Sequence, residues 1–461
     1  MTSHFQNNIK AFKKNCPEVA GLADTIPESM EVFGSRKGPV TARYRGRLLH
    51  SAYDPVKEAD AFSRDIPGGC SIGLYGFGLG YHIESLLEKI GPGGKLLAIE
   101  LNSGLLATAF QVRDLTHLAE DPRFELVFGA EEKNTAERIT QAMPALMQED
   151  SGIPRFLFHP ASFECLPEAF PNIAIALEVI RLERRVPVLF GDLEQSNAEH
   201  NRDAVLASPG IRQLYDRYAN RPGVLVSAGP SLDGLRPFLP FLSRHCILGC
   251  VDTALPVLST LGVTPHFVFS LDPQDASFSH FEPCLDGVVP LVFTPSSNPK
   301  IIRNYKSEHY VVFKEGHAAT VAQEPLAREK GLTQAGGSVS CLALDCLLKM
   351  GCDPVFLIGQ DCAHSGNRPY ASTGTPAAPA ALETRDHRQS LIPVAGCQGA
   401  PIPTTHTLYS YLRTLEQIIE ANPQQRVFNL SSQGARIAGA PEVGTLGELL
   451  PLLNQEKGLK T

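Results

Sequence analysis

The sequence has no excess of positive charge, no long apolar run and no apolar signal-peptide core. Its 41 lysine and arginine residues stand against 49 acidic ones, for a formal net charge of −8. This balance argues against a general binder of nucleic acid or of anionic membranes. No apolar run reaches the roughly 20 residues that a membrane span needs, and residues 1–16 lack a leader's apolar core. We therefore expect a cytoplasmic protein with no nucleic-acid partner and no membrane span.

Closely paired cysteines are also missing. The eleven cysteines are scattered, none forms a CxxC pair, and Cys246, Cys250, Cys341 and Cys346 lie inside apolar runs. This distribution is typical of reduced cysteines and not of a disulfide framework or a zinc site. The sequence shows no compact cluster of metal ligands, so we predict no metal-binding residues.

With 461 residues, the chain is long enough for two or three domains. Its order of apolar runs, turns and helical patterns predicts an α/β protein. We expect a Rossmann-like central domain with a mostly parallel sheet, a smaller α/β N-terminal domain and a short C-terminal segment. The predicted parts are an N-terminal domain at 1–195, a helical connector at 196–222, the central domain at 223–440 and a C-terminal tail helix at 441–461.

The stretch Ser227-Ala228-Gly229-Pro230-Ser231 follows a short apolar run, residues 223–226, that predicts a buried strand. Residues 233–239 can open a helix. The N-terminus of a helix has unpaired N–H groups and favours negative charge. Gly229 has no side chain to block a phosphate, and Ser231 can cap the helix and donate a hydroxyl. An ordinary strand-to-helix turn would have the same kinds of residue, so the prediction of an anion-binding site here depends on the segments that follow.

Further strands are predicted at 246–251, 266–271, 289–293, 310–313 and 355–358, with an amphipathic helix after Gly336-Gly337-Ser338. Such alternation implies a mostly parallel sheet, in which ligands bind beyond the carboxyl ends of the strands. Small or polar residues recur at these ends: Gly229, Ser231, Asp252, Asp272, Asn298, Gly337, Ser338, Gln360 and Asp361. One such residue is expected at any strand end, but their recurrence indicates a ligand crevice.

Residues 72–100 read as a strand, a glycine-rich turn at Gly76–Gly80, a helix and a second strand that ends at Glu100. This unit resembles the opening of Rossmann-like methyltransferases, in which such an acid binds a ribose. The glycines would serve equally to let a helix pack closely on a strand. No catalytic constellation accompanies this turn, so whether it binds a ligand stays open.

Four stretches of the central domain closely resemble the Maf proteins, motility-associated factors that glycosylate flagellin. They are SAGPSL at 227–232, CVDTALPVL at 250–258, TPHFVFSLDP at 264–273 and the segment 336–361. NLSSQGARIAG at 429–439 is similar to the family's C-terminal signature. Tyr53-Asp54-Pro55 and the glycine turn at 76–80 are similar to its N-terminal domain.

The Maf family is similar in turn to bacterial sialyltransferases that use CMP-sialic acid. This likeness implies that a tyrosine after the strand-end GxD motif binds the donor phosphate and that a later histidine is the base. Here the motif is Gly359-Gln360-Asp361, the tyrosine is Tyr370 and the histidine is His406, with His364 and His387 competing for the role of base.

The resemblance thus implies His406 and Asp361 as catalytic residues. The residues that it implies for binding the nucleotide sugar are Ser227, Gly229, Pro230, Ser231, Asp252, Asp272, Gly337, Ser338, Gln360 and Tyr370.

The implied reaction moves a nonulosonic acid, such as pseudaminic or legionaminic acid, from its CMP-activated form to a Ser or Thr hydroxyl of flagellin. No cofactor is required in principle, although Asp252, Asp272 and Asp361 at neighbouring strand ends are able to hold Mg²⁺. The central domain also resembles archaeal hydroxymethylpterin pyrophosphokinase, which would use ATP and Mg²⁺. A non-catalytic protein that binds flagellin is the third alternative.

Overall fold

The computed structural model describes residues 2–24, 30–129, 131–146, 155–321, 323–364, 371, 391–431 and 433–453. The chain divides into two compact units, Met1–Arg181 and Leu182–Thr461. The division falls inside the long helix α8 (Pro171–His200). The residues predicted as a connector, 196–222, therefore lie in the second unit.

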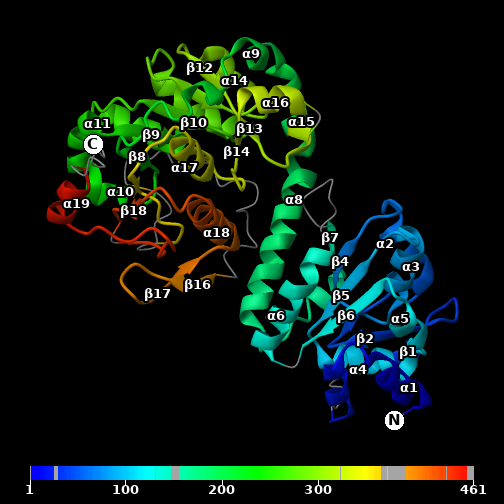
Figure 1. The fold of residues 1–461 in the computed structure, drawn as a ribbon. Coiled ribbons are helices and arrows are strands. Elements are labelled where there is room, and N and C mark those ends of the chain that lie inside the picture. The colour runs from blue at the N-terminus through cyan, green and yellow to red at the C-terminus, as the bar shows by residue number, and fades with distance from the viewer. Residues whose placement is uncertain are drawn as a thin grey trace, which may run out of the picture. The chain divides into compact units, whose positions relative to one another are not determined.

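The first unit is built on a four-stranded parallel sheet with the strand order β6-β5-β4-β7 (Figure 1). The strands are β4 (Ile72–Tyr75), β5 (Leu96–Glu100), β6 (Phe124–Phe128) and β7 (Arg155–Phe158). Every residue of β4 and β5 is buried, as expected for parallel strands covered on both faces. The strands predicted on either side of the glycine turn are confirmed as β4 and β5.

The remaining elements of the first unit are a small antiparallel sheet and short helices. The antiparallel strands are β1 (Met30–Gly34), β2 (Val40–Tyr44) and β3 (Arg47–Leu48). The α-helices are α1 (Ser3–Phe12), α2 (Pro55–Ser63), α3 (Tyr81–Ile90), α4 (Ser103–Val112), α5 (Thr116–Glu120), α6 (Glu132–Ala142) and α7 (Pro160–Phe163). Asp54 and Asn102 cap α2 and α4 through their side-chain oxygens.

The second unit contains a seven-stranded, fully parallel sheet with the order β12-β11-β10-β9-β8-β15-β18. Its strands are β8 (Gly223–Val226), β9 (Ile247–Val251), β10 (Phe267–Ser270), β11 (Leu291–Phe293), β12 (His309–Val311), β15 (Val355–Ile358) and β18 (Val427–Asn429). The predicted α/β class with a mostly parallel sheet is confirmed. The strand predicted at 310–313 is split, because β13 (Phe313–Lys314) pairs with β14 (Leu332–Thr333) in a separate small sheet.

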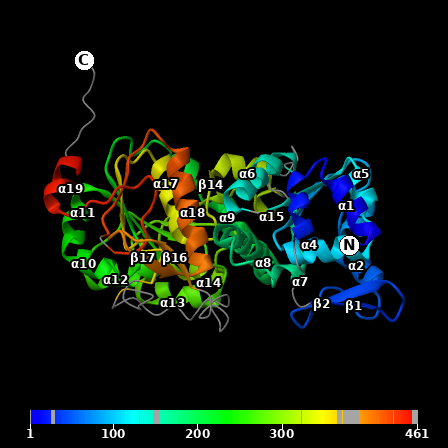
Figure 2. The same ribbon diagram turned by 90° about the horizontal axis from the view of Figure 1, so that it is seen from below.

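Two long helices of this unit lie side by side (Figure 2). They are α17 (Val339–Lys349) and α18 (His406–Ala421). α17 packs on β8, β9 and β10, and nine of its eleven residues are buried. The helix predicted after Gly336-Gly337-Ser338 is thus confirmed.

The other α-helices of this unit are shorter. They are α9 (Arg202–Ala207), α10 (Leu232–Leu235), α11 (Leu239–His245), α12 (Leu255–Thr260), α13 (Phe278–Phe281), α14 (Pro299–Asn304), α15 (Ala318–Val321), α16 (Glu324–Lys330) and α19 (Leu446–Leu453). A hairpin of β16 (Ile392–Ala395) and β17 (Pro401–Thr404) precedes α18.

All eleven cysteines belong to the described part of the chain, and each is a free thiol. Within the same residues, no helix combines the length and apolar character that crossing a bilayer demands.

Candidate functional site

The strand order of the second unit places a topological switch point between β8 and β15. From β8 the chain moves outward through β9, β10, β11 and β12, whereas β15 and β18 are added on the other side of β8. Beyond the loops that leave β8 and β15, the chain therefore continues toward opposite sides of the sheet. Open α/β sheets bind their ligands at such a point. The two loops carry the SAGPSL stretch and the Gly359-Gln360-Asp361 motif.

These two loops are tied together by hydrogen bonds. The Ser227 hydroxyl donates to Gln360 Oε1 at 2.7 Å. The Gly229 N–H donates to the Gly359 carbonyl at 2.9 Å, and the Ser231 N–H donates to Asp361 Oδ2 at 2.8 Å. The N–H groups of Gly229 and Ser231, which we expected to face a phosphate, are thus bonded within the protein, and Pro230 has none to offer.

Asp361 is the centre of this junction. Besides the Ser231 N–H, its carboxylate accepts the hydroxyls of Ser231 and of Ser431, the latter at 3.3 Å. The side chain is buried. Burial raises the pKa of the Asp361 carboxyl, while the hydrogen bonds from Ser231 and Ser431 oppose this rise. These contacts make Asp361 a residue that joins the loops after β8, β15 and β18.

The absence of a side chain at Gly229 has a packing reason. A Cβ at this position would lie 2.5 Å from the Gly359 carbonyl oxygen and 2.8 Å from Asp361 Oδ2. Both distances are far below normal van der Waals contact. The space beside Gly229 is therefore filled by the β15 loop.

A second polar group lies where the adjacent strands β9 and β10 end. Asp252 accepts the Thr253 N–H and Asp272 accepts the Gln274 N–H, each at 2.8 Å. Burial and the negative charge of Asp252 raise the pKa of the Asp272 carboxyl. The two predicted carboxylates are thus close enough to affect each other.

His280 on α13 completes this group and was not predicted. Its Nδ1 lies 4.0 Å from Asp252 Oδ2, and the side chain is buried. Neither ring nitrogen has a hydrogen-bond partner among the described residues. Nothing in the local sequence singles out this histidine, which lies eight positions after Asp272 in the short helix α13.

Gly337 and Ser338 lie at the start of α17. Gly336 and Gly337 have φ values of +50° and +80°, a region that favours glycine. The helix ends at Lys349 and β15 begins at Val355, so α17 runs antiparallel to the strands and its first turn lies at their carboxyl edge. The Ser338 hydroxyl bonds the Ser340 hydroxyl at 2.9 Å. The first N–H groups of an α-helix have no intrahelical acceptor.

His406 is the first residue of α18, after the cap residue Thr405. The preceding segment is bound to the chain that follows β15. Thr404 Oγ1 donates to the Cys362 carbonyl at 2.7 Å, and the His364 N–H donates to the Pro403 carbonyl at 2.9 Å. The structure thus brings the segments of His406, His364 and the GxD motif together. Tyr370 and His387 lie outside the described residues.

The three acids considered for Mg²⁺ do not form one ligand set. β8 lies between β9, which precedes Asp252, and β15, which precedes Asp361. Across the part of the chain that the structure describes, the three carboxylates do not converge closely enough to share an ion. Asp252 and Asp272 remain a pair on neighbouring strands.

The glycine turn of the first unit is also filled by protein. Gly76, Gly78 and Gly80 all have positive φ, and a Cβ at Gly76 would lie 2.6 Å from Ser162 Cβ. Glu100 is fully buried, and its carboxylate accepts the N–H groups of Phe77, Leu101 and Asn102 at 2.9–3.0 Å. Burial raises the pKa of Glu100 to about 7. The Glu100 carboxylate thus accepts its hydrogen bonds from the protein itself and holds the glycine turn in place.

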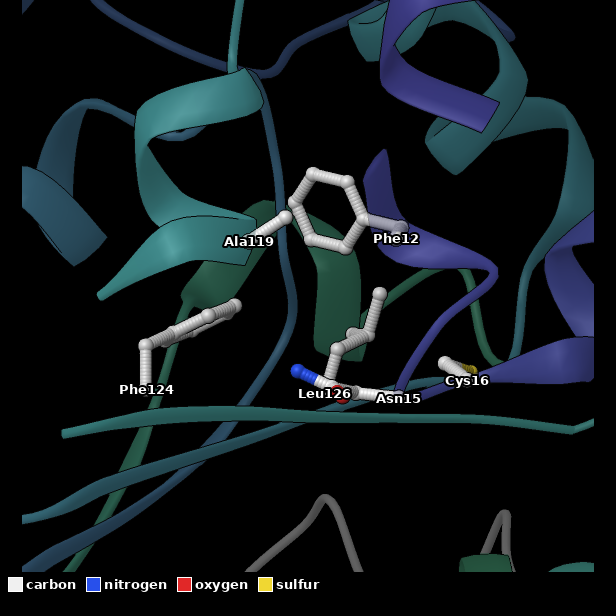
Figure 3. Close-up of a pocket in the computed structure, with 6 residues that line it drawn as sticks. All are labelled: Phe12, Asn15, Cys16, Ala119, Phe124 and Leu126. Carbon is white, nitrogen blue, oxygen red and sulfur yellow. The ribbon is translucent and has the colours of Figure 1, made fainter. Parts of the chain in front are cut away.

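A hollow elsewhere in the first unit is lined by six residues, none of them charged (Figure 3). The lining residues are Phe12, Asn15, Cys16, Ala119, Phe124 and Leu126. It offers no charged side chain to anchor a phosphate or a carboxylate.

Residues 196–367 match the family model described as 6-hydroxymethylpterin diphosphokinase MptE-like. This match confirms the predicted resemblance of the central domain to hydroxymethylpterin pyrophosphokinase-like proteins. It covers the strands from β8 to β15 and thus both sides of the switch point.

Two relatives are each described as an uncharacterized protein of Treponema pallidum (strain Nichols). One is 28% identical over 172 residues, which are 36% of this chain and 79% of the relative. The other is 25% identical over 260 residues, which are 52% of this chain and 85% of the relative. Among solved structures, the MAf glycosyltransferase from Magnetospirillum magneticum AMB-1 is similar over 96% of this chain and 74% of its own, with a TM-score of 0.48 and 17% identity.

Proposed function

We propose that the second unit is the catalytic part of a cytoplasmic glycosyltransferase. It would transfer a nonulosonic acid, such as pseudaminic or legionaminic acid, from a CMP donor to a Ser or Thr hydroxyl of flagellin. The observation that carries the proposal is the switch point between β8 and β15. The two loops that leave these strands are the ones whose sequences, SAGPSL and Gly359-Gln360-Asp361, resemble the Maf proteins.

The transfer requires stabilisation of the departing CMP, because its phosphate gains charge as the bond to the sugar breaks. The amides of Gly229 and Ser231 are engaged with the β15 loop. The first turn of α17 is the better source of donors, since it is an eleven-residue helix that begins at the carboxyl edge of the sheet. We therefore assign the phosphate to the start of α17, near Gly337 and Ser338, with Tyr370 as a further predicted contact.

The acceptor hydroxyl must lose a proton during the attack, and a histidine suits this role near neutral pH. His406 begins α18, which packs beside α17. α18 ends at Ala421 and β18 begins at Val427, so the first turn of α18 also faces the carboxyl edge. This placement supports His406 as the base.

One observation favours a second candidate function, an ATP-dependent pyrophosphokinase. The family match at 196–367 includes Asp252 and Asp272, two carboxylates that interact across neighbouring strands. Such a pair suits Mg²⁺ bound to ATP phosphates. The Maf-like signature at 429–439 lies outside that match and favours sugar transfer.

The test is transfer to flagellin with the purified chain. Recombinant unmodified flagellin is incubated with CMP-pseudaminic or CMP-legionaminic acid and analysed by intact-protein and peptide mass spectrometry. We expect flagellin to gain the mass of one or more nonulosonic acids with release of CMP. Unchanged flagellin with both donors, together with AMP formation from ATP and 6-hydroxymethylpterin, would replace this proposal with the pyrophosphokinase.

A further inference from the structure

The first unit contains three buried histidines whose rings lie against one another. His50 follows β3, His82 lies in the first turn of α3, and His159 follows β7. Their exposed fractions are 3%, 2% and 6%. The ring centroids of His82 and His159 are 4.4 Å apart, and those of His50 and His159 are 4.8 Å apart. Three segments that are distant in sequence thus bring their imidazoles to one place.

One nitrogen of each ring is within 4.8 Å of the corresponding nitrogens of the other two. The ring edges also face a common point beside Gly78. A Cβ on this glycine would lie 2.6 Å from His50 Nε2, 3.0 Å from His82 Cε1 and 3.1 Å from His159 Cε1. Any other residue at position 78 would therefore put its side chain between the three rings.

Each ring is also anchored through a nitrogen to a neighbouring oxygen. His50 Nδ1 lies 3.4 Å from Glu58 Oε2, His82 Nε2 lies 3.0 Å from the Gly76 carbonyl, and His159 Nδ1 lies 2.8 Å from Ser162 Oγ. Metal-binding histidines commonly use their second nitrogen in this way, since a carboxylate or carbonyl partner fixes the orientation of the ring.

His82 provides an independent sign of a ligand. Its Nδ1 is buried and has no hydrogen-bond partner among the described residues, whereas buried polar atoms are nearly always paired. A metal ion bound at this nitrogen would supply the missing partner.

We propose that His50, His82 and His159 form a binding site for a divalent transition-metal ion of the zinc class. Imidazole nitrogen is a preferred ligand of these ions. Three histidines leave the fourth tetrahedral position for water or another small ligand. The ion would join the segment after β3, the start of α3 and the segment after β7, which together surround the glycine turn.

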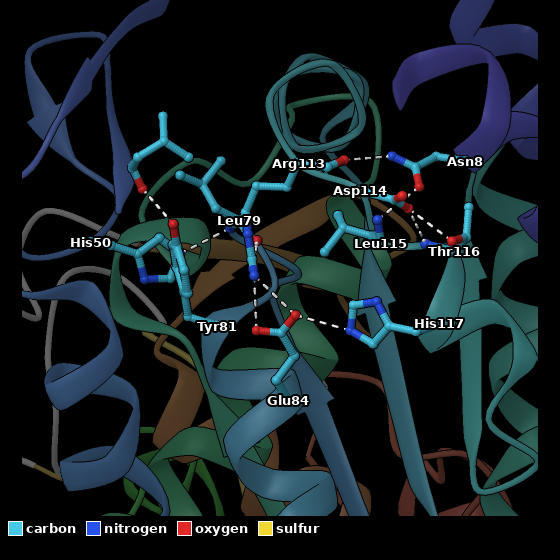
Figure 4. Close-up of polar contacts among 11 residues, drawn as sticks. Asn8, His50, Leu79, Tyr81, Glu84, Arg113, Asp114, Leu115, Thr116 and His117 are labelled. Atoms are coloured by element: carbon cyan, nitrogen blue, oxygen red, sulfur yellow. Dashed lines mark hydrogen bonds and ion pairs between the residues drawn. The ribbon is translucent and has the colours of Figure 1, made fainter. Parts of the chain in front are cut away.

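One existing contact competes with the ion. His50 Nε2 accepts the Leu79 N–H at 2.9 Å (Figure 4). The Leu79 carbonyl in turn accepts Arg113 Nη1 at 2.7 Å, and Arg113 pairs with Glu84 at 2.9 Å. Ligation by His50 would release the Leu79 N–H. The flanking residues Gly78 and Gly80, with φ of +51° and +89°, give this peptide freedom to turn.

The test uses the full chain stripped with a chelator and then titrated with Zn²⁺ or Co²⁺. We expect close to one equivalent of tightly bound ion per chain and a higher melting temperature. With Co²⁺ we expect visible ligand-field bands and paramagnetically shifted imidazole N–H signals from three histidines. His82→Phe keeps an aromatic ring in the stack but removes the ligand, so it should lose the bound equivalent, whereas His117→Phe, at an exposed histidine, should keep it.

The Co²⁺ signals are read on the unaltered protein, so the test holds even where His82→Phe fails to fold. Absence of binding by the unaltered chain, or binding without shifted histidine signals, would overturn the site. Equal binding by a folded His82→Phe variant would show that the ion lies elsewhere and would overturn it too. The outcome of this metal-binding test does not depend on nucleotide binding or sugar transfer by the second unit.

Discussion

The carboxylate of Asp361 accepts hydrogen bonds from three groups that belong to two other loops. A residue with its lone pairs engaged in this way acts mainly by holding its surroundings in place. We therefore expect Asp361 to position the loops of the switch point. Its assignment as a catalytic residue remains a prediction that a substitution can test.

Asp361→Asn keeps the size of the side chain but turns one acceptor oxygen into a donor. This places an N–H₂ group against the Ser231 or Ser431 donors in a buried site. We expect the free energy of unfolding to fall by about 1–3 kcal/mol, measured by urea denaturation. The exposed Asp286→Asn serves as the control. Unchanged stability combined with lost transfer would assign Asp361 to the chemistry instead.

His406→Ala tests the proposed base. Removing a general base typically lowers the rate by about 10²–10⁴-fold, and we expect a loss in this range in the transfer of sugar to flagellin. Because the His406 side chain is buried, the rates are compared well below the melting temperature of the variant. His364→Ala, in the neighbouring segment, is the matched control and should keep its activity. Turnover like that of the unaltered protein in His406→Ala would remove this histidine from the mechanism.

The contact between the loops after β8 and β15 depends on the close approach at Gly229. Gly229→Ala would force its Cβ against the Gly359 carbonyl and Asp361. Overpacking of this kind costs about 1–3 kcal/mol, so the melting temperature should fall. Gly234→Ala, where an added Cβ meets nothing within 4 Å, should be neutral or slightly stabilising. Equal stability of the two variants would contradict the packing role of Gly229.

Helix α8 is held by an ion pair whose carboxylate, that of Glu194, is buried. Glu194 lies 2.7 Å from Lys314 Nζ and 3.0 Å from His317 Nε2. Burial opposes ionisation of Glu194, but the hydrogen bond from His317 and the charge of Lys314 outweigh it and lower the pKa from 4.5 to about 2. The ionised group thus stabilises the fold above pH 4.5, and this stabilisation is lost as the pH falls toward 2.

The difference between the two pKa values corresponds to about 3 kcal/mol at neutral pH. We expect Glu194→Gln to lose stability of this order at pH 7 and to show a weaker dependence on pH between 4.5 and 2. Urea denaturation across this range provides the measurement, with the exposed Glu199→Gln on the same helix as control. A pH profile identical to that of the unaltered protein would contradict the role of Glu194.

The strands of the central domain could be predicted because they are short apolar runs that end in polar residues. β8, β9, β10 and β15 all lie where these runs indicate. The contacts at the strand ends could not be predicted, since they join loops far apart in sequence. Ser431 lies within the signature at 429–439, but only the fold shows that it reaches Asp361.

Each of the two units contains a parallel sheet and a glycine-bearing turn after one of its central strands. In the sequence both turns read as candidate ligand sites, and the second of them as a site for a phosphate. In the structure the first is filled by His50, His82 and His159, and the second by the loop of Gln360 and Asp361. Glycine at such a turn signals close approach, but the sequence does not say whether a ligand or the protein itself approaches.

We propose that the switch point of the second unit binds the nucleotide of a CMP-sugar. Isothermal titration calorimetry of the full chain with CMP and with ATP, each with and without Mg²⁺, tests this binding. We predict that CMP binds without added metal and that ATP binds more weakly even with Mg²⁺. Ser338→Ala, at the start of α17, should weaken CMP binding while the chain stays folded. Strictly Mg²⁺-dependent binding of ATP, with no heat from CMP, would contradict a CMP-sugar site at the switch point.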